Sequence, residues 1–163
     1  MPLRPARPLP AFRLCVAAAL AALAAPAAGA QKVGVESLAD LAFPTIVWGE
    51  TLRIEPSGAG AASFRVARLR GKPTPQVRLT FGPAPVLQTS GGSTLAVTFG
   101  PSSAAWADNN GGPLTAFDPR QSLTVTLPGD GDLYVWLGGT AAPTSAQSPG
   151  SYAGTVTLSV ADF

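Results

Sequence analysis

The chain has no histidine and only one cysteine, Cys15, among its 163 residues. Without histidine it lacks the usual general base, and a Ser-His-Asp arrangement is excluded. The usual zinc ligands are missing for the same reason, so we expect neither a metal nor a cofactor. A lone cysteine forms no disulfide within the chain, and the fold must therefore depend on its apolar core. These absences predict a protein that is not an enzyme.

The first thirty residues are typical of a secretory signal peptide. Arg4, Arg7 and Arg13 give a basic start, residues 14–25 form a short apolar run, and Ala28-Gly29-Ala30 is a small-x-small cleavage site. The run is too short to cross a bilayer, so no transmembrane anchor is expected. We predict a signal peptide at 1–30 and one domain at 31–163, exported to the periplasm, the cell surface or the medium.

Removal of this leader changes the charge of the protein. Three of the 11 basic residues lie in it and none of the 9 acidic ones, so the net charge falls from +2 to 8 − 9 = −1. The pI of 9.1 therefore reflects the leader. Nucleic acid is not an expected partner.

The rest of the chain consists of short apolar–polar alternations separated by turns rich in proline and glycine. No segment of ten or more residues after the leader has helical spacing, and a period of two predicts strands with one buried face. The alternating segments are 33–35, 39–43, 51–55, 62–67, 76–81, 93–99, 122–127, 133–137 and 150–163. This pattern predicts an all-β sandwich of about eight or nine strands.

Four local features follow from these alternations. Glu36 and Ser37 are expected to break the first strand, and the second should stop at Phe43 or lie at a sheet edge, because Pro44 has no backbone donor. The glycine-rich turn at 128–132 predicts a hairpin between 122–127 and 133–137. The stretch 150–163 is expected to be one long strand.

Two loops are rich in oxygen ligands. Asp130 and Asp132 lie in a glycine turn, and a second loop is Asp108-Asn109-Asn110-Gly111-Gly112. Either loop could hold calcium through side-chain and carbonyl oxygens. Turn formation is the favoured interpretation, because neither loop has the ligand spacing of a known calcium loop.

Basic and aromatic residues offer two further candidate surfaces. One is the cluster Arg65, Arg68, Arg70, Lys72 and Arg78; the other is a sugar platform formed from Trp48, Trp106, Tyr134 and Trp136. A solvated strand face is favoured for the first and packing for the second. Trp136 is the exception, because it shares a strand face with Tyr134, opposite to the apolar face of 133–137.

Several motifs in order resemble a known family. They are Leu41-x-Phe43, Gly49 followed by 51–56, 62–66, 133–140 ending in Gly138-Gly139-Thr140, and 150–160. Together they resemble a secreted bacterial family, the domain of unknown function numbered four-four-zero-two. That family is similar to the spore coat protein U domain and to Mat-type (common pilus) fimbrial subunits. Gly150 also stands fourteenth from the C-terminus, as a glycine does in many chaperone-usher pilins.

The resemblance implies an immunoglobulin-like, pilin-like β-sandwich that assembles by donor-strand addition. It would act as a structural or surface protein whose partners are copies of itself or other pilin-like subunits, with a periplasmic chaperone and an outer-membrane usher. The candidate donor-strand residues are Val33, Val35, Leu41 and Phe43. The candidate acceptor or closing strand carries Gly150, Tyr152, Gly154, Val156, Leu158 and Val160.

An alternative remains open at this stage. The chain can be a self-contained exported sandwich that binds a glycan, a peptide or an envelope component. The two hypotheses differ in the N-terminal strand, since Val33 and Val35 pair within their own chain in a self-contained domain.

Overall fold

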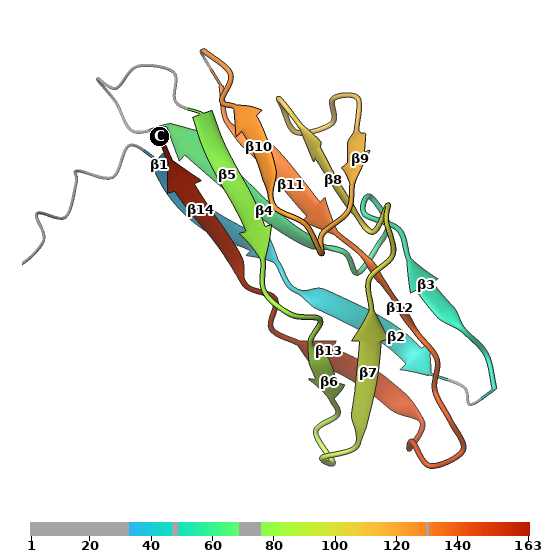
Figure 1. Cartoon of the computed structure of the whole chain (residues 1–163). Helices are drawn as coiled ribbons and strands as arrows, with labels where there is room; N and C mark the ends of the chain where they lie inside the picture. Colours follow the sequence, from blue (N-terminus) through green and yellow to red (C-terminus); the bar gives the residue numbers. More distant parts are fainter. Residues whose placement is uncertain (1–32, 47–48, 69–75, 130) are drawn as a thin grey trace, which may run out of the picture.

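The computed structural model describes residues 33–46, 49–68, 76–129 and 131–163, and all regular structure in these ranges is β (Figure 1). The strands are β1 (Val33–Ala39), β2 (Leu41–Ile46), β3 (Leu52–Ile54), β4 (Ala62–Arg68), β5 (Gln76–Phe81), β6 (Val86–Gln88), β7 (Thr94–Thr98), β8 (Ala104–Ala107), β9 (Thr115–Phe117), β10 (Leu123–Thr126), β11 (Leu133–Leu137), β12 (Gly139–Ala141), β13 (Gly150–Gly154) and β14 (Leu158–Asp162). The all-β expectation is confirmed. No helix within these ranges is long and apolar enough to cross a membrane.

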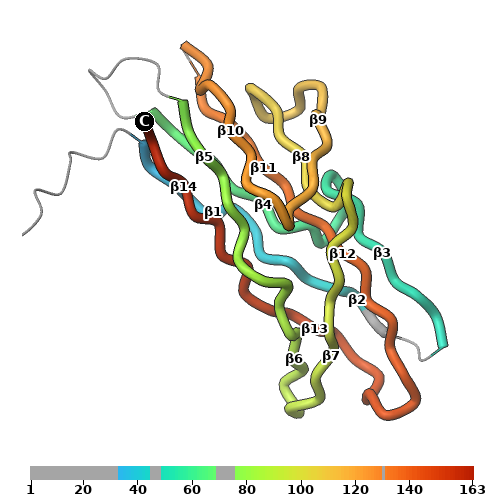
Figure 2. The backbone as a smooth tube through the Cα atoms, viewed as in Figure 1, coloured from blue at the N-terminus to red at the C-terminus, as the bar shows by residue number. Residues whose placement is uncertain are grey.

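The strands form three antiparallel sheets with the orders β1-β4-β11-β8-β9, β10-β5-β14 and β2-β13-β6-β7-β12-β3. In the upper half of Figure 1 the three-stranded sheet lies over the five-stranded sheet, and the six-stranded sheet occupies the lower half. The backbone trace in Figure 2 shows β1 running on into β2, β5 into β6, β11 into β12, and β13 into β14. The described residues contain 14 strands, above the expected eight or nine. The segment 150–163 divides into β13 and β14, and β6, β8, β9 and β12 lie in stretches where no strand was predicted.

Part of the strand order in the upper half matches that of an immunoglobulin-like sandwich. β1-β4-β11-β8 follow the order of strands A, B, E and D, and the neighbours β5 and β14 correspond to C and F. In that fold a further strand, G, lies on the free side of F. Among the described residues no strand pairs with β14 on that side.

The core forms between the sheets from the residues that the alternation places inward. β5 shows the pattern most clearly, because Val77, Leu79 and Phe81 are buried and the residues between them are exposed. Tyr152 is fully buried at the other end, and its hydroxyl donates a hydrogen bond to the Ser148 carbonyl oxygen at 2.7 Å. This hydroxyl-to-backbone contact satisfies the one polar atom of a large core side chain.

The N-terminal expectations are partly wrong. β1 continues through Glu36 and Ser37, which pair with Arg65 and Phe64, and the register shifts only between Ser37 and Ala39. Cross-strand pairing thus overrides the break in the apolar pattern. β2 continues past Pro44, but it lies at the edge of its sheet, where a missing backbone donor costs least.

Two expectations further along the chain are also wrong. β10 pairs with β5, and β11 pairs with β4 and β8, so β10 and β11 lie in different sheets and do not form a hairpin. The last segment is two strands, because β13 pairs with β2 and β6, whereas β14 pairs with β5. In both cases the partner strand is distant in sequence.

Candidate functional site

The candidate donor residues lie in strands of their own chain. Val33 and Val35 of β1 pair with Arg68 and Val66 of β4. Leu41 and Phe43 of β2 pair with Gly154 and Tyr152 of β13. Three of the four are buried in the core, and Val35 is 40% exposed. Within this chain the segment thus forms β1 and β2, each paired with a strand of the same chain.

The candidate acceptor residues divide between β13, β14 and the residues between them. Gly150, Tyr152 and Gly154 belong to β13. A side chain on Gly154 would place its Cβ 2.7 Å from Leu87 Cδ2, so glycine permits β13 to lie close against β6. Val156 lies between the strands and Leu158 and Val160 in β14; all three are half-buried against the core.

β1 and β14 lie side by side without pairing with each other (Figures 1 and 2). Their inward residues are only partly covered at this junction. Val160 is half-buried although its register partner on β5, Leu79, is fully buried. We call the junction lined by Val35, Val156, Leu158 and Val160 the terminal-strand seam. It is an apolar strip at the place where an immunoglobulin-like sandwich has strand G.

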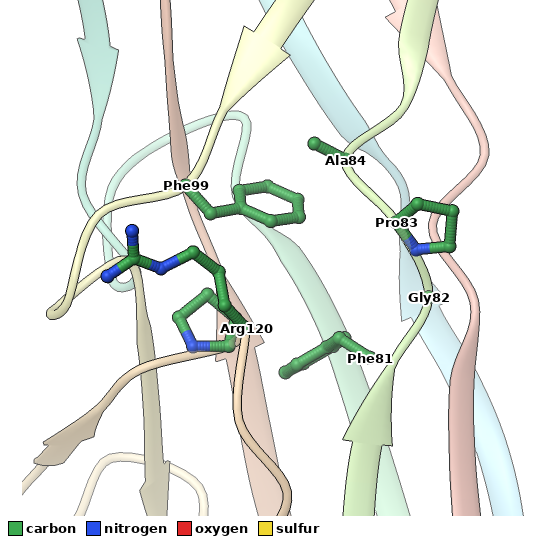
Figure 3. Close-up of a pocket in the computed structure, with 7 residues that line it drawn as sticks. Phe81, Gly82, Pro83, Ala84, Phe99 and Arg120 are labelled. Atoms are coloured by element: carbon green, nitrogen blue, oxygen red, sulfur yellow. The ribbon is translucent and has the colours of Figure 1, made fainter.

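A pocket of about 280 Å³ opens where β5 leads into β6. Its lining residues are Phe81, Gly82, Pro83, Ala84, Phe99, Pro119 and Arg120. Figure 3 shows Phe99 and Arg120 on one side of the opening, Pro83 and Ala84 on the other, and Phe81 below it. The walls are apolar, and the one charged group, Arg120, lies at the side. Sequence reasoning missed this pocket because its walls come from three separate loops.

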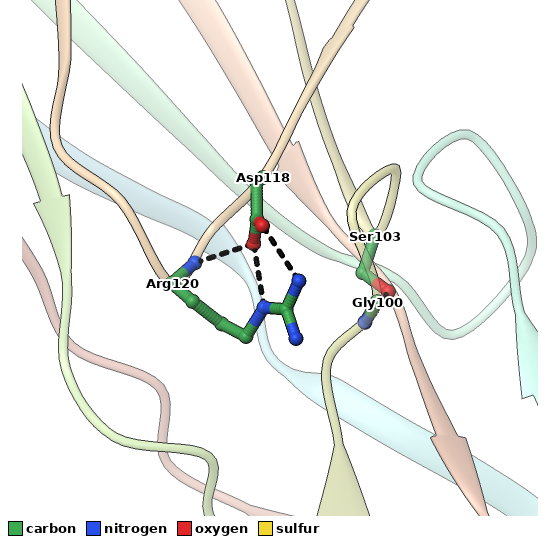
Figure 4. A network of polar contacts seen from close by, with 4 residues as sticks. All are labelled: Gly100, Ser103, Asp118 and Arg120. Carbon is green, nitrogen blue, oxygen red and sulfur yellow. Dashed lines mark hydrogen bonds and ion pairs between the residues drawn. The ribbon is translucent and has the colours of Figure 1, made fainter.

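The guanidinium of Arg120 is held by Asp118 (Figure 4). Its Nε donates to Asp118 Oδ1 at 2.9 Å and its Nη2 to Oδ2 at 2.7 Å, while the Arg120 backbone N–H donates to Oδ1 at 3.0 Å. The side-chain hydrogen bonds from Arg120 lower the pKa of Asp118 from 3.8 to about 2. The same contact raises the pKa of Arg120. The arginine is therefore neutralised beside the pocket and gives it no free positive charge.

The same view includes a turn that fixes the approach to β8. The Gly100 backbone N–H donates to Ser103 Oγ at 2.9 Å, and the Ser103 N–H donates to the Gly100 carbonyl at 3.1 Å. The Gly138 N–H then donates to the Ser103 carbonyl oxygen at 2.8 Å. These bonds tie the turn to the junction of β11 and β12, so Ser103 has a structural role.

The oxygen-rich loops do not gather metal ligands. Within the described ranges no group of three or more acidic, histidine or cysteine side chains is placed to hold an ion. Asp132 instead contacts Arg65, and the Gly112 N–H donates to the Asn109 carbonyl at 3.3 Å, as in a turn. Asp130 lies outside the described residues.

The basic cluster is separated by the fold. Arg65 lies on β4 in the five-stranded sheet, between Glu36 at 3.5 Å and Asp132 at 3.1 Å. Arg78 lies on β5 in the opposite sheet, with its guanidinium carbon 5.0 Å from the centroid of the Phe163 ring. Arg70 and Lys72 lie outside the described residues.

The four aromatic residues do not form one platform. Trp106 pairs in register with the buried Val135 and packs against the core. Tyr134 and Trp136 lie on the other face of β11, with ring centroids 6.1 Å apart and planes 25° from parallel. Trp48 lies outside the described residues. The predicted common face of Tyr134 and Trp136 is therefore present.

We compared the chain with protein families, curated proteins and solved structures. No protein-family model, no curated protein and no solved structure matches the chain.

Proposed function

We propose that this chain is an exported, non-enzymatic, pilin-like structural or surface subunit that receives an extended segment of a partner at the terminal-strand seam. The observation that carries the proposal is the incomplete cover of β14. Val160 and Leu158 face the core yet are half-buried, whereas Leu79 beside them is fully buried. An added strand at the position of G would cover them.

Strand addition suits the seam for two reasons. Among the strands of the described ranges β14 pairs with β5 alone, so a second strand can add main-chain hydrogen bonds along the other side of residues 158–161. Alternate side chains of the incoming strand would then point into the core and bury Val35 and Val160. A partner segment with apolar residues at every second position meets both requirements.

The donor is a copy of this chain or another pilin-like subunit, assembled with a periplasmic chaperone and an usher, as the resemblance implies. The segment with Val33, Val35, Leu41 and Phe43 has the required alternation. This segment pairs with β4 and β13 of its own chain, so a subunit that donates it must first break those strand pairings. Two copies could then exchange this segment, as in domain swapping.

A self-contained exported binding module is the second candidate function. The pairing of Val33 and Val35 with β4 in the same chain favours it. Under this alternative the seam stays open and the protein remains a monomer.

The test compares two substitutions on neighbouring positions of β14 in the mature protein, residues 31–163. Val160→Glu places a charge in the seam, and Ser159→Glu places the same charge on the outward face as a matched control. We expect the unheated wild type and the control to give a ladder of oligomers on a denaturing gel. Val160→Glu should give monomers that retain the circular dichroism of a β protein.

Deletion of residues 31–37 tests the donor segment separately and should also abolish the ladder. If the wild type is a monomer at every concentration, assembly from copies of this chain alone is refuted. The self-contained module is then the function to pursue.

A further inference from the structure

The outward face of the five-stranded sheet carries an aromatic pair that the core does not use. Tyr134 and Trp136 alternate along β11 with Leu133, Val135 and Leu137, which are fully buried. β11 lies in the middle of its sheet, between β4 and β8. Two large rings thus lie next to each other, both half-buried, at the centre of a sheet face.

Both rings have an unused polar group. Within the described part of the chain, neither the Tyr134 hydroxyl nor the Trp136 indole N–H takes part in a hydrogen bond. Tyrosine and tryptophan combine an apolar ring with a hydrogen-bonding end, which suits a ligand with both kinds of surface.

The two sides of the pair differ. On the β8 side the register partners of Trp136 and Tyr134 are Ala105 and Ala107, which are both buried, so that side of the rings is covered. On the β4 side the partners are Ser63 and Arg65. A ligand that contacts the rings therefore meets polar groups on the β4 side.

Arg65 is the centre of a row of charges. It lies between Glu36 of β1 and Asp132, at 3.5 and 3.1 Å. Its Nε is shielded from solvent and, although close to Asp132, is not aligned for a hydrogen bond. Two carboxylates thus flank one guanidinium, and the row carries both acceptors and donors beside the rings.

We propose that this face, the aromatic platform formed by Tyr134, Trp136, Arg65, Glu36 and Asp132, binds the pyranose rings of a neutral glycan. One face of a pyranose ring presents C–H groups that pack on an aromatic ring. Its hydroxyls both donate and accept, which matches the mixed row of charges. An acidic sugar would meet the excess carboxylate, and a purely apolar partner would leave the row unsatisfied.

This inference does not depend on strand addition. The aromatic platform lies on the outward face of the sheet, whereas the terminal-strand seam opens toward the core between β1 and β14. One property can therefore fail while the other holds.

The experiment uses the mature protein and a panel of neutral linear oligosaccharides, made of β-linked glucose, α-linked glucose, mannose or N-acetylglucosamine. Binding is followed by tryptophan fluorescence and by calorimetry. We expect at least one member to bind with a Kd of about 1 mM or lower. Trp136→Ala and Tyr134→Ala should weaken that binding at least about tenfold. Trp106→Phe is the matched control, because Trp106 faces the core from the next strand, and it should leave the Kd unchanged.

Tyr134→Phe provides a second, milder variant in which only the hydroxyl is lost, and it should weaken binding a few-fold. The proposal is overturned if no neutral oligosaccharide binds up to about 10 mM, or if both alanine variants bind as the wild type does. Stronger binding of an acidic glycan, or a dimer that Trp136→Ala dissociates, would also overturn it. The gel ladder expected from strand addition should persist in Trp136→Ala, which separates the two proposals.

Discussion

Gly138 is a residue whose identity is dictated by backbone packing. A Cβ at this position would lie 2.0 Å from the carbonyl oxygen of Ile54, on the neighbouring edge strand. Gly138-Gly139-Thr140 is also one of the motifs on which the family resemblance rests. The motif therefore has a structural explanation that requires no ligand.

The first prediction follows from this contact. Gly138→Ala should destabilise the fold by about 2–3 kcal/mol or more, because the backbone of β3 must move to admit the methyl group. Gly129→Ala is the control, since a Cβ there has no neighbour within 4 Å and should change the free energy of unfolding little. Urea denaturation of both variants measures the difference. Equal stabilities would show that the β3–β12 contact is looser than described.

Asp118 provides the second prediction at the residue scale. Its pKa falls to about 2 in the folded protein from an ordinary value of 3.8. A lowered pKa means that its ionised form stabilises the fold; this contribution is complete above about pH 4 and disappears as the pH falls through about 2. Asp118→Asn should lower the melting temperature slightly at pH 7 and by almost nothing at pH 2. A melting difference that is constant over this range would contradict the assignment.

At the scale of elements, β5 and β14 differ in how completely their inward-facing side chains are buried. Val77 on β5 is fully buried, whereas Val160 on β14 is half-buried, and both are inward-facing valines of neighbouring strands. Their environments differ in how much of the side chain the core covers.

Val77→Ala should therefore cost the monomer about 2 kcal/mol, from the lost apolar burial and the cavity left behind. Val160→Ala should cost less than half of that. If assembly by strand addition occurs, the loss for Val160→Ala should be greater in the oligomer than in the monomer. Chemical denaturation of both forms provides the values, and equal losses in the monomer would refute an open seam.

The strands themselves were largely predictable, whereas their partners were not. The alternation Val77, Leu79, Phe81 identifies β5 and its buried face from sequence alone, and the parity of Tyr134 with Trp136 correctly places both rings on one face. The hairpin expectation failed because Leu123–Thr126 pairs with β5, more than forty residues earlier, a choice that local turn residues do not encode. The apolar–polar alternation of an N-terminal strand likewise does not tell whether the strand pairs within its own chain or with another chain.

The candidate sites differ in the same way. The sequence indicated only that a terminal strand could have an uncovered side. The exposure of the terminal-strand seam depends on the positions of the other strands around β14, which the sequence of β14 does not encode. The pocket beside Phe81 and Phe99 joins loops that are separated in sequence, and no motif marks it. The Asp118–Arg120 pair is local, and opposite charges two residues apart around a proline were the available signal.

At the scale of the whole molecule, export is the property that remains to be tested first. The basic start, apolar run and Ala28-Gly29-Ala30 site predict cleavage after Ala30. Expression of the full chain in a bacterium, followed by intact-mass measurement of the periplasmic fraction, should give a protein that begins at Gln31. Replacement of Ala30 by a bulky residue should leave the leader attached, and an uncleaved wild type in the cytoplasm would refute the prediction.

The arrangement of β1 and β14 also determines how the molecule would bear load. The start of β1 and the end of β14 lie at the same end of the molecule (Figure 1). A force applied between these two ends would peel β1 from β4 one hydrogen bond at a time, which is a mechanically weak geometry. A strand inserted along β14 and pulled lengthwise would instead be loaded in shear, with all its hydrogen bonds resisting together. Filling the seam would thus turn a domain that unzips easily into a link that withstands tension.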